Sequence, residues 1–228
     1  MTTRLLTLPH AGAGAGTYRP WQRFATADLT LHPVQLPGRE DEFNSPRYAT
    51  FADAAAGTAE RVRAAAGTDP YVLFGHSFGA VLAYETVHHL RATGGPLPRH
   101  LVLSGSVSPR HRGPQWISDD DEQAVADLKR GSDGGLEALD HPQLRALLLP
   151  TIRADIRLLS DYRPSTLEPL PIPMTVLRGT DDATVPPDEW LAWAEFTTEK
   201  FDPVELPGGH MYLTARAAEV WRIIEGVL

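Results

Sequence analysis

Short apolar runs alternate with longer stretches of helical periodicity along most of the chain. Residues 52–65 have a helix-forming composition, and apolar residues recur at three-residue steps through residues 78–90 and again through residues 218–228. The apolar, leucine-rich or β-branched runs that separate such stretches are residues 5–8, 31–35, 71–74, 101–104, 174–177 and 204–206. This alternation predicts an α/β fold, in which helices cover a mostly parallel sheet.

One region interrupts the alternation. Between Pro109 and Pro173 there is no strand-like run, but there are helical stretches at about residues 119–129, 143–149 and 151–162, with a glycine-rich turn at residues 131–135. We therefore expect a single domain over residues 1–228 with a helical insertion at about residues 110–172. Insertions at the top of such a sheet lie over the chemistry, which favours a mobile lid hinged at the glycine turn. A plain helical connection between two strands is the alternative.

Composition narrows the class of protein. Hydrophobic residues make up 42% and charged residues 22% of the chain, as in ordinary globular proteins. The net charge of −8 argues against nucleic acid or an anionic membrane as the main partner. The absence of cysteine excludes disulfides and thiolate zinc sites. No apolar run is long enough for a signal peptide or a membrane span, so we expect a cytoplasmic protein, a monomer without cofactor or metal.

The strongest chemical signal is the sequence Gly75-His76-Ser77-Phe78-Gly79, a G-x-S-x-G match between a predicted strand and a predicted helix. A turn this tight strains the serine backbone and needs small residues on either side. It exposes the serine oxygen beside a helix N-terminus, where backbone amides can stabilise negative charge. We predict that Ser77 is a nucleophile and that the chain adopts the α/β-hydrolase fold; an incidental serine in a glycine-rich loop is the alternative.

A serine nucleophile needs a base, normally an imidazole. In this fold the chain order is serine, acid, histidine, which leaves His100, His111, His141 and His210. His210 follows a predicted strand in the loop Pro-Gly-Gly-His and precedes the final helix. We predict His210 as the general base and solvated loop positions for the other three.

The orienting acid should follow the strand at residues 174–177. Two adjacent aspartates, Asp181 and Asp182, lie in the loop there. The spacing G-x-x-D-x-x-V fits Gly179, Asp182 and Val185, so we predict Asp182 and keep Asp181 as the alternative. The acid would hold His210 in the right tautomer and stabilise the imidazolium.

An acyl-transfer site of this kind also needs two backbone donors for the developing oxyanion. We predict the amide of Phe78, directly after the nucleophile, and the amide of Ala11, in the small-residue loop that follows the first strand. His10 would brace that loop. A phosphate cradle is disfavoured because the loop reads G-x-G-x-G with no Gly-Lys-Ser/Thr after it.

Beyond these positions the chain resembles the type II thioesterases, the stand-alone editing enzymes of polyketide and nonribosomal peptide assembly lines. The resemblance covers nearly the whole chain, and Leu-Pro-Gly-Arg and Leu-Pro-x-x-Arg-Ala-Asp are its most specific pieces. Departures are small: Phe78 stands where methionine is frequent and Ala13 where glycine is common. The matching segments are residues 8–12 (LPHAG), 35–40 (QLPGRE), 73–80 (LFGHSFGA), 103–109 (LSGSVSP), 149–155 (LPTIRAD) and 207–210 (PGGH).

The resemblance implies hydrolysis of acyl groups from the phosphopantetheine arm of acyl or peptidyl carrier proteins. Carrier proteins are usually acidic and this chain is acidic too, so docking would rest on apolar contact and local arginines, for which Arg19, Arg110 and Arg112 are candidates. Two alternatives stay open: a small-molecule carboxylesterase with the same triad, and a binding protein that has lost catalysis on the same fold.

Overall fold

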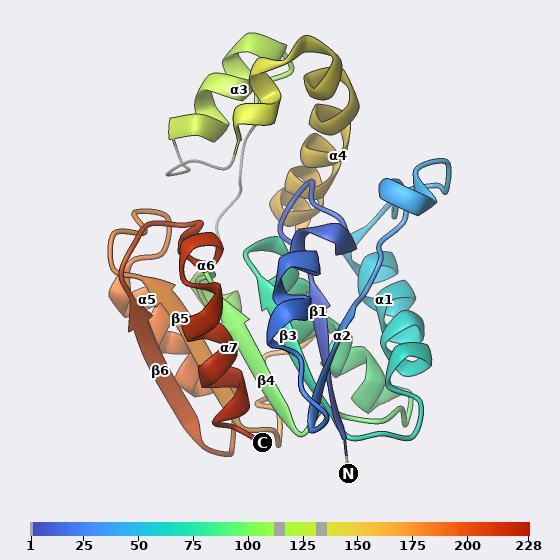
Figure 1. Ribbon diagram of the computed structural model, residues 1–228, viewed down its shortest axis with the longest axis vertical. Coiled ribbons are helices and arrows are strands. Elements are labelled where there is room, and N and C mark those ends of the chain that lie inside the picture. The colour runs from blue at the N-terminus through green and yellow to red at the C-terminus, as the bar shows by residue number, and fades with distance from the viewer. Residues whose placement is uncertain (1, 112–116, 131–135) are drawn as a thin grey trace.

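The computed structural model describes residues 2–111, 117–130 and 136–228. Within these residues one sheet has the strand order β2-β1-β3-β4-β5-β6, and every pairing in it is parallel (Figure 1). The parallel sheet predicted from the sequence is therefore confirmed. The strands are β1 (Thr3–Leu8), β2 (Leu29–Pro33), β3 (Tyr71–His76), β4 (His100–Ser104), β5 (Met174–Gly179) and β6 (Phe201–Leu206).

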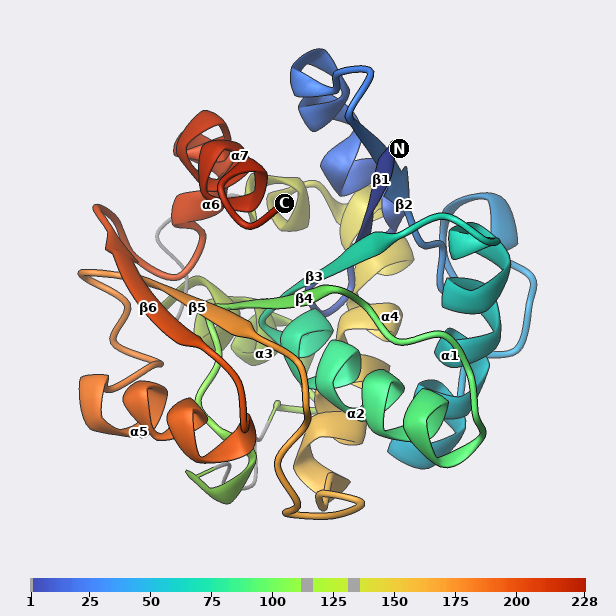
Figure 2. The same cartoon turned by 90° about the horizontal axis from the view of Figure 1, so that it is seen from below.

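Helices cover both faces of the sheet (Figure 2). On one face lie α1 (Phe51–Ala66), α2 (Phe78–Ala92), α5 (Pro187–Leu191) and the 3-10 helix η5 (Ala192–Phe196). On the other lie η1 (Ala15–Phe24), α6 (Tyr212–Ala215) and α7 (Ala217–Glu225). The short 3-10 helices η2 (Glu40–Glu42) and η3 (Pro109–His111) occur in loops.

Each strand contributes to two hydrophobic cores because successive side chains point to opposite faces. Leu6 and Leu73 pack with α1 and α2, whereas the neighbouring residues Leu5 and Val72 pack with Trp21 of η1 and the end of the chain. Since both faces are covered, the strands β3, β4 and β5 are buried along their whole length rather than at alternate residues. This burial holds the carboxyl ends of the strands, where the candidate site lies, at fixed positions.

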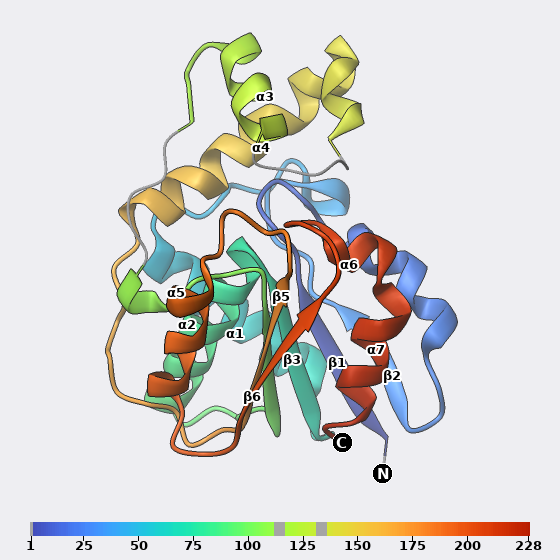
Figure 3. The ribbon, with the colours of Figure 1, turned by 90° about the vertical axis from the view of Figure 1, so that its left-hand side faces the viewer.

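The insertion between β4 and β5 rises above the carboxyl ends of the strands (Figures 1 and 3). It contains α3 (Asp121–Arg130), the 3-10 helix η4 (Glu137–Asp140) and α4 (Pro142–Asp161). The sequence predicted two helices on either side of Pro150, but the structure has a single helix, α4, that continues through it. Pro150 removes one backbone hydrogen bond without ending the helix. The predicted hinge at residues 131–135 lies outside the described residues.

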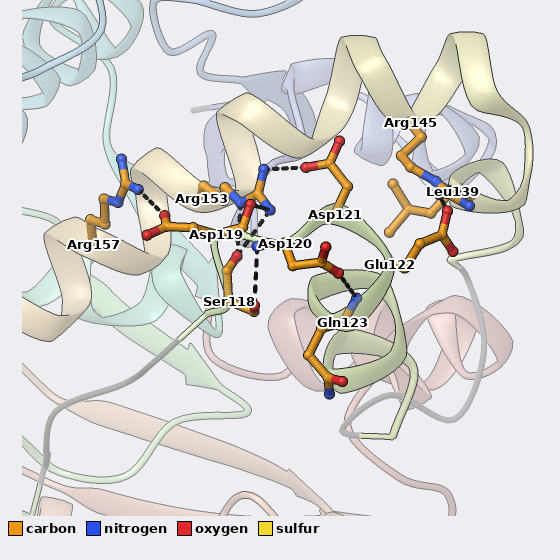
Figure 4. Close-up of polar contacts among 10 residues, drawn as sticks. All are labelled: Ser118, Asp119, Asp120, Asp121, Glu122, Gln123, Leu139, Arg145, Arg153 and Arg157. Atoms are coloured by element: carbon orange, nitrogen blue, oxygen red, sulfur yellow. Dashed lines mark hydrogen bonds and ion pairs between the residues drawn. The ribbon is translucent and has the colours of Figure 1, made fainter.

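Acidic residues at the start of α3 and just before it pair with arginines of α4 (Figure 4). Arg153 pairs with Asp121 at 2.6 Å, Arg157 with Asp119 at 2.8 Å, and Arg145 with Glu122. The acidic partners are largely exposed. Beneath them a small apolar cluster joins Val125 of α3 to residues of α4, so α3 is held to α4 far more lightly than the sheet is held to its helices.

Strand and helix boundaries differ from the prediction at a few places. β2 lies two residues earlier than expected, because Leu29 and Leu31 point into the core beside Trp21. β6 begins at Phe201 and tolerates Pro203 because it is the edge strand of the sheet. Leu170, in the region expected to lack strands, forms an isolated parallel bridge with Thr197.

The buried face of the last helix, α7, also differs slightly from the prediction. Ala217 and Val220 are buried, whereas Ala218 and Leu228 are not.

Across the described ranges, none of the helices combines the length and the apolar character needed to cross a bilayer.

Candidate active site

Ser77 occupies the tight turn between β3 and α2. Its φ of +55° lies in the left-handed region, which is uncommon for a residue with a side chain. The turn closes only because Gly75 and Gly79 lack side chains: a Cβ on Gly75 would lie 2.0 Å from the Gly79 carbonyl oxygen, and one on Gly79 would lie 2.4 Å from that of Leu8. The Ser77 amide donates to the Ser104 carbonyl at 2.8 Å, which ties the turn to the end of β4.

His210 lies beside Ser77 although 133 residues separate them in sequence. Its Nε2 is 3.0 Å from the Ser77 Oγ, and its Nδ1 is 2.8 Å from the Asp182 Oδ2. A carboxylate can only accept, so Nδ1 carries the proton that is donated to Asp182. Nε2 is then left free to accept the proton of the serine hydroxyl.

Asp182 is 2% exposed and is held by more than His210. Its Oδ1 accepts from the Thr184 amide at 2.9 Å and from the Thr184 hydroxyl at 2.6 Å, which closes a local turn typical of aspartate. Burial alone would raise the pKa of Asp182, but the hydrogen bonds from His210 and Thr184 outweigh it and lower that pKa. Asp182 is thus ionised at neutral pH. Asp181 is exposed, and its amide donates to the Gly208 carbonyl instead.

The loops that carry the acid and the histidine are bound to each other. Thr180 donates its amide to the Leu206 carbonyl at 2.9 Å, beside the Asp181–Gly208 bond. The close approach needs a glycine at 179, where a Cβ would lie 2.3 Å from the carbonyl oxygens of Gly208 and Gly209. Asp182 and His210 therefore keep their separation through backbone contacts as well as their own hydrogen bond.

Two further histidines pack around His210. His76 is fully buried, its ring centroid is 5.1 Å from that of His210, and its Nδ1 lies 2.8 Å from the Ser104 Oγ. His10 lies 6.1 Å from His76, ring to ring. Burial, the nearby His210 and Arg39 lower the pKa of His10 to about 4, and burial with His210 lowers that of His76 well below 6.5. Both rings are therefore neutral, which agrees with a bracing role for His10.

The predicted oxyanion donors come from the nucleophile turn and from the loop that follows β1. Phe78 is the first residue of α2, so its amide has no acceptor within the helix. Ala11 is in the loop that follows β1, whose Leu8 carbonyl contacts Gly79. The neighbouring Gly12 has a φ of +79°, a conformation that suits glycine. A cavity of about 370 Å³ adjoins this loop, lined by Gly12, Arg39, Phe43, Leu147 and Thr151 among others.

Comparison with known proteins decides the family. The family model described as "Thioesterase domain" matches residues 3–228. The chain belongs to the thioesterase family. The predicted enzyme class, a hydrolase that acts on thioesters, is thereby confirmed.

Relatives and solved structures agree with this assignment. The thioesterase is 33% identical over 223 residues to the AMB antimetabolite synthetase AmbE of Pseudomonas aeruginosa; the match covers 97% of this chain but 10% of that protein. RedJ, a thioesterase from the prodiginine biosynthetic pathway in Streptomyces coelicolor, is 32% identical with a TM-score of 0.90, over 99% of this chain and 85% of RedJ.

BorB, a type II thioesterase from the borrelidin biosynthetic cluster, is 30% identical with a TM-score of 0.88, over 100% of this chain and 93% of BorB. The expected α/β-hydrolase fold and the resemblance to type II thioesterases are confirmed.

The structure thus brings Ser77, Asp182 and His210 of the thioesterase into one hydrogen-bonded chain. Thr184 was not predicted from the sequence, although an aspartate followed two residues later by threonine is a recognisable turn pattern.

The arginines predicted to dock carrier proteins differ in their surroundings. Arg110 pairs with Glu195 at 3.1 Å, Arg19 is exposed on η1, and Arg112 lies outside the described residues.

Proposed function

We propose that this thioesterase hydrolyses acyl groups from the phosphopantetheine arm of acyl or peptidyl carrier proteins, with Ser77, His210 and Asp182 as its catalytic triad. In that role it would free polyketide or nonribosomal peptide synthases that are stalled or mis-primed. One observation carries the proposal: a serine in a strained strand-to-helix turn, 3.0 Å from the Nε2 of a histidine whose Nδ1 is bound to a buried carboxylate. RedJ and BorB, which come from biosynthetic pathways, support the substrate class.

In the first half-reaction the Ser77 Oγ attacks the thioester carbonyl carbon while His210 Nε2 takes the hydroxyl proton. The carbonyl oxygen becomes an oxyanion, to which the amides of Phe78 and Ala11 donate hydrogen bonds. When the tetrahedral intermediate collapses, the carbon–sulfur bond breaks and His210 returns its proton to the leaving thiolate. Ser77 then carries the acyl group as an ester, and the carrier protein leaves with a free thiol.

In the second half-reaction His210 takes a proton from water, and the hydroxide attacks the acyl-serine ester. The second oxyanion uses the same two amides. Collapse breaks the bond to Ser77 Oγ, which recovers its proton from His210, and the free carboxylic acid departs. Asp182 stays ionised throughout and stabilises the imidazolium that forms in each half-reaction.

The thioesterase would act as a monomer in the cytoplasm. The alternative to carrier-protein hydrolysis is a small-molecule carboxylesterase that uses the same triad. Intact-mass analysis of carrier proteins carrying different acyl groups tests the proposal directly. We expect loss of the acyl mass with the phosphopantetheine arm left in place, and a kcat/KM well above that for the same acyl group on a short thiol. Equal kcat/KM for the two substrates would favour the carboxylesterase.

The Ser77→Ala variant is the control for the nucleophile. We expect a loss of kcat of about a thousandfold or more, because the remaining hydrogen-bond donors cannot replace the attacking oxygen. Folding, measured by circular dichroism and melting temperature, should be retained. Activity within tenfold of the wild-type would contradict the assignment of Ser77.

A further inference from the structure

Two of the most specific sequence segments, Leu-Pro-Gly-Arg and Leu-Pro-x-x-Arg-Ala-Asp, meet at one buried ion pair. The Arg39 Nη1 lies 2.8 Å from the Asp155 Oδ2, and its Nη2 lies 2.9 Å from the Oδ1. The side chains are 7% and 2% exposed. Such a two-pronged pair fixes direction as well as distance, because the guanidinium fork matches the carboxylate. It joins α4, in the lid, to the loop that follows β2.

Both partners also bind the loop after β1. The Gly12 amide donates to the Asp155 Oδ2 at 2.7 Å, and the Arg39 Nη1 donates to the Ala13 carbonyl at 3.0 Å. The ion pair therefore holds a backbone donor and a backbone acceptor from neighbouring residues. Ala11, the predicted oxyanion donor, immediately precedes Gly12.

α4 also packs directly against the loop after β1. A Cβ on Gly12 would lie 2.1 Å from the Ile152 Cγ1, so this part of the helix leaves room only for a glycine. Ile152 and Asp155 are three residues apart and thus share one helix face. One turn of α4 therefore supplies both a steric contact and an electrostatic contact to the loop.

We propose that Arg39 and Asp155 are positioning residues that hold the Ala11 amide at the oxyanion. The inference rests on the proposed function, because it requires that Ala11 donates to the oxyanion. A loop with glycine at 12, 14 and 16 has many accessible backbone conformations, and an oxyanion hole works only when its donors are preorganised. The ion pair selects one conformation. The second half of α4 thus belongs to the active site rather than to a moving lid.

Asp155→Asn tests this, with Asp121→Asn as the matched control. Asp121 also pairs with an arginine of α4, but its side chain is 60% exposed. We expect Asp155→Asn to lower kcat about 10- to 100-fold, approaching the effect of removing an oxyanion donor, with KM within about twofold. The rate at which a fluorophosphonate labels Ser77 should fall in parallel, because that reaction also develops charge on an oxygen. Asp121→Asn should change none of these.

A second variant separates positioning from stability. Asp155→Asn leaves the Arg39 charge buried without its full partner and is expected to lower the melting temperature. The double variant Arg39→Met with Asp155→Leu removes both charges, and replacing a buried ion pair by apolar residues is often nearly neutral for stability. We expect its melting temperature to recover while kcat and Ser77 labelling stay low, because leucine at 155 offers the Gly12 amide no acceptor.

A folded double variant with wild-type kcat and wild-type labelling would overturn the inference. Failure of both variants to fold would assign the pair a purely structural role and overturn it as well. If Ser77 of the wild-type protein is not labelled at all, the proposed function fails first, so the two failures are distinguishable.

Discussion

Asp182 combines two properties that seldom occur together in a carboxylate. It is almost fully buried, which favours the neutral acid, yet hydrogen bonds from His210 and both donors of Thr184 lower its pKa. The charge is therefore kept where water cannot screen it. A fixed anion in such surroundings interacts more strongly with an imidazolium than a solvated one does.

The neighbouring aspartate gives a direct test of this role. We expect Asp182→Asn to lower kcat by about 10³ to 10⁴, because an amide neither selects the right histidine tautomer nor balances the imidazolium charge. Asp181→Asn, at an exposed side chain one residue away, should stay within about twofold. Steady-state kinetics on one acyl substrate measure both. Greater damage from Asp181→Asn would make Asp181 the acid.

At the scale of the elements, the ends of β3 and β4 pack closely against each other next to Ser77. Gly105, which follows β4, has a φ of +61°, and a Cβ there would lie 2.6 Å from the His76 Cε1 and 3.4 Å from the His210 Cε1. Gly94 has a similar φ of +67°, but a Cβ there would meet nothing within 4 Å. The two glycines share the same backbone requirement and differ only in crowding.

Alanine at each position separates these effects. Gly94→Ala should lower the free energy of unfolding by about 1 kcal/mol, the cost of a side chain at positive φ. Gly105→Ala should cost about 2 kcal/mol more, because the methyl group overlaps His76. It should also lower kcat, because the same methyl group would lie 3.4 Å from the His210 Cε1. Urea denaturation gives the free energy of unfolding of the two variants, and steady-state kinetics gives their kcat. Equal destabilisation by the two changes would show that the contact with His76 does not matter.

The proposed lid, α3 and α4, divides into two parts with different attachments. The buried residues of α4 lie from Leu149 onward, whereas Leu144 and Leu147 in its first half are about half exposed. α3 is joined to α4 by a small apolar cluster and by ion pairs with exposed acidic partners (Figure 4). We therefore expect lid motion in α3 and the first half of α4.

Hydrogen exchange tests this division. Amides of α3 should exchange faster than those of β3, and faster still in about 1 M salt, which screens exposed ion pairs. The second half of α4 should be slow and insensitive to salt, because the Arg39–Asp155 pair is buried. A non-hydrolysable acyl-pantetheine mimic trapped on Ser77 should slow α3. Protection of α3 equal to that of β3, unchanged by salt or mimic, would contradict a moving lid.

At the scale of the whole molecule, buried histidines link stability to pH. Burial lowers the pKa of His10, His88 and His100 to about 4, and that of His76 well below 6.5. In the unfolded chain these histidines have pKa values near 6.5. Between about pH 6.5 and pH 4 the unfolded chain therefore binds more protons than the folded one. The stability that these residues contribute is complete above pH 6.5 and is lost progressively as the pH falls.

His100→Gln should make that loss shallower. The solvated loop position predicted for His100 is wrong, because this residue is the first of β4 and is buried. Its Nε2 is 2.8 Å from the Thr175 hydroxyl, a contact that glutamine can make. Near pH 5 the number of protons taken up on unfolding should fall by about one, read from the slope of unfolding free energy against pH. His141→Gln, at an exposed position, is the control and should leave the slope unchanged. Equal slopes for wild-type and His100→Gln would contradict the prediction.

Local patterns in the sequence were sufficient for most elements of the fold. The alternation of short apolar runs and helical periodicity predicted the parallel sheet, because burial on both faces requires apolar strands and the helices need one apolar side. The turn around Ser77 was predictable for a similar reason, since its geometry depends on a few adjacent residues. The chain order and the spacing of Gly179, Asp182 and Val185 led to the acid and the histidine that the structure brings to Ser77.

Tertiary packing decided the features that join distant segments. Pro150 suggested two helices, yet α4 continues through it because Leu149 and Ile152 are buried on either side. Arg39 and Asp155 are 116 residues apart, and Gly12 and Asp155 are 143 apart, so no local pattern reports their meeting. The sequence by itself determined which elements form and which residues can do the chemistry, because both depend on neighbours along the chain. Only the folded structure decided that Asp155 binds the loop after β1, because that contact exists only once α4 has packed against the top of the sheet.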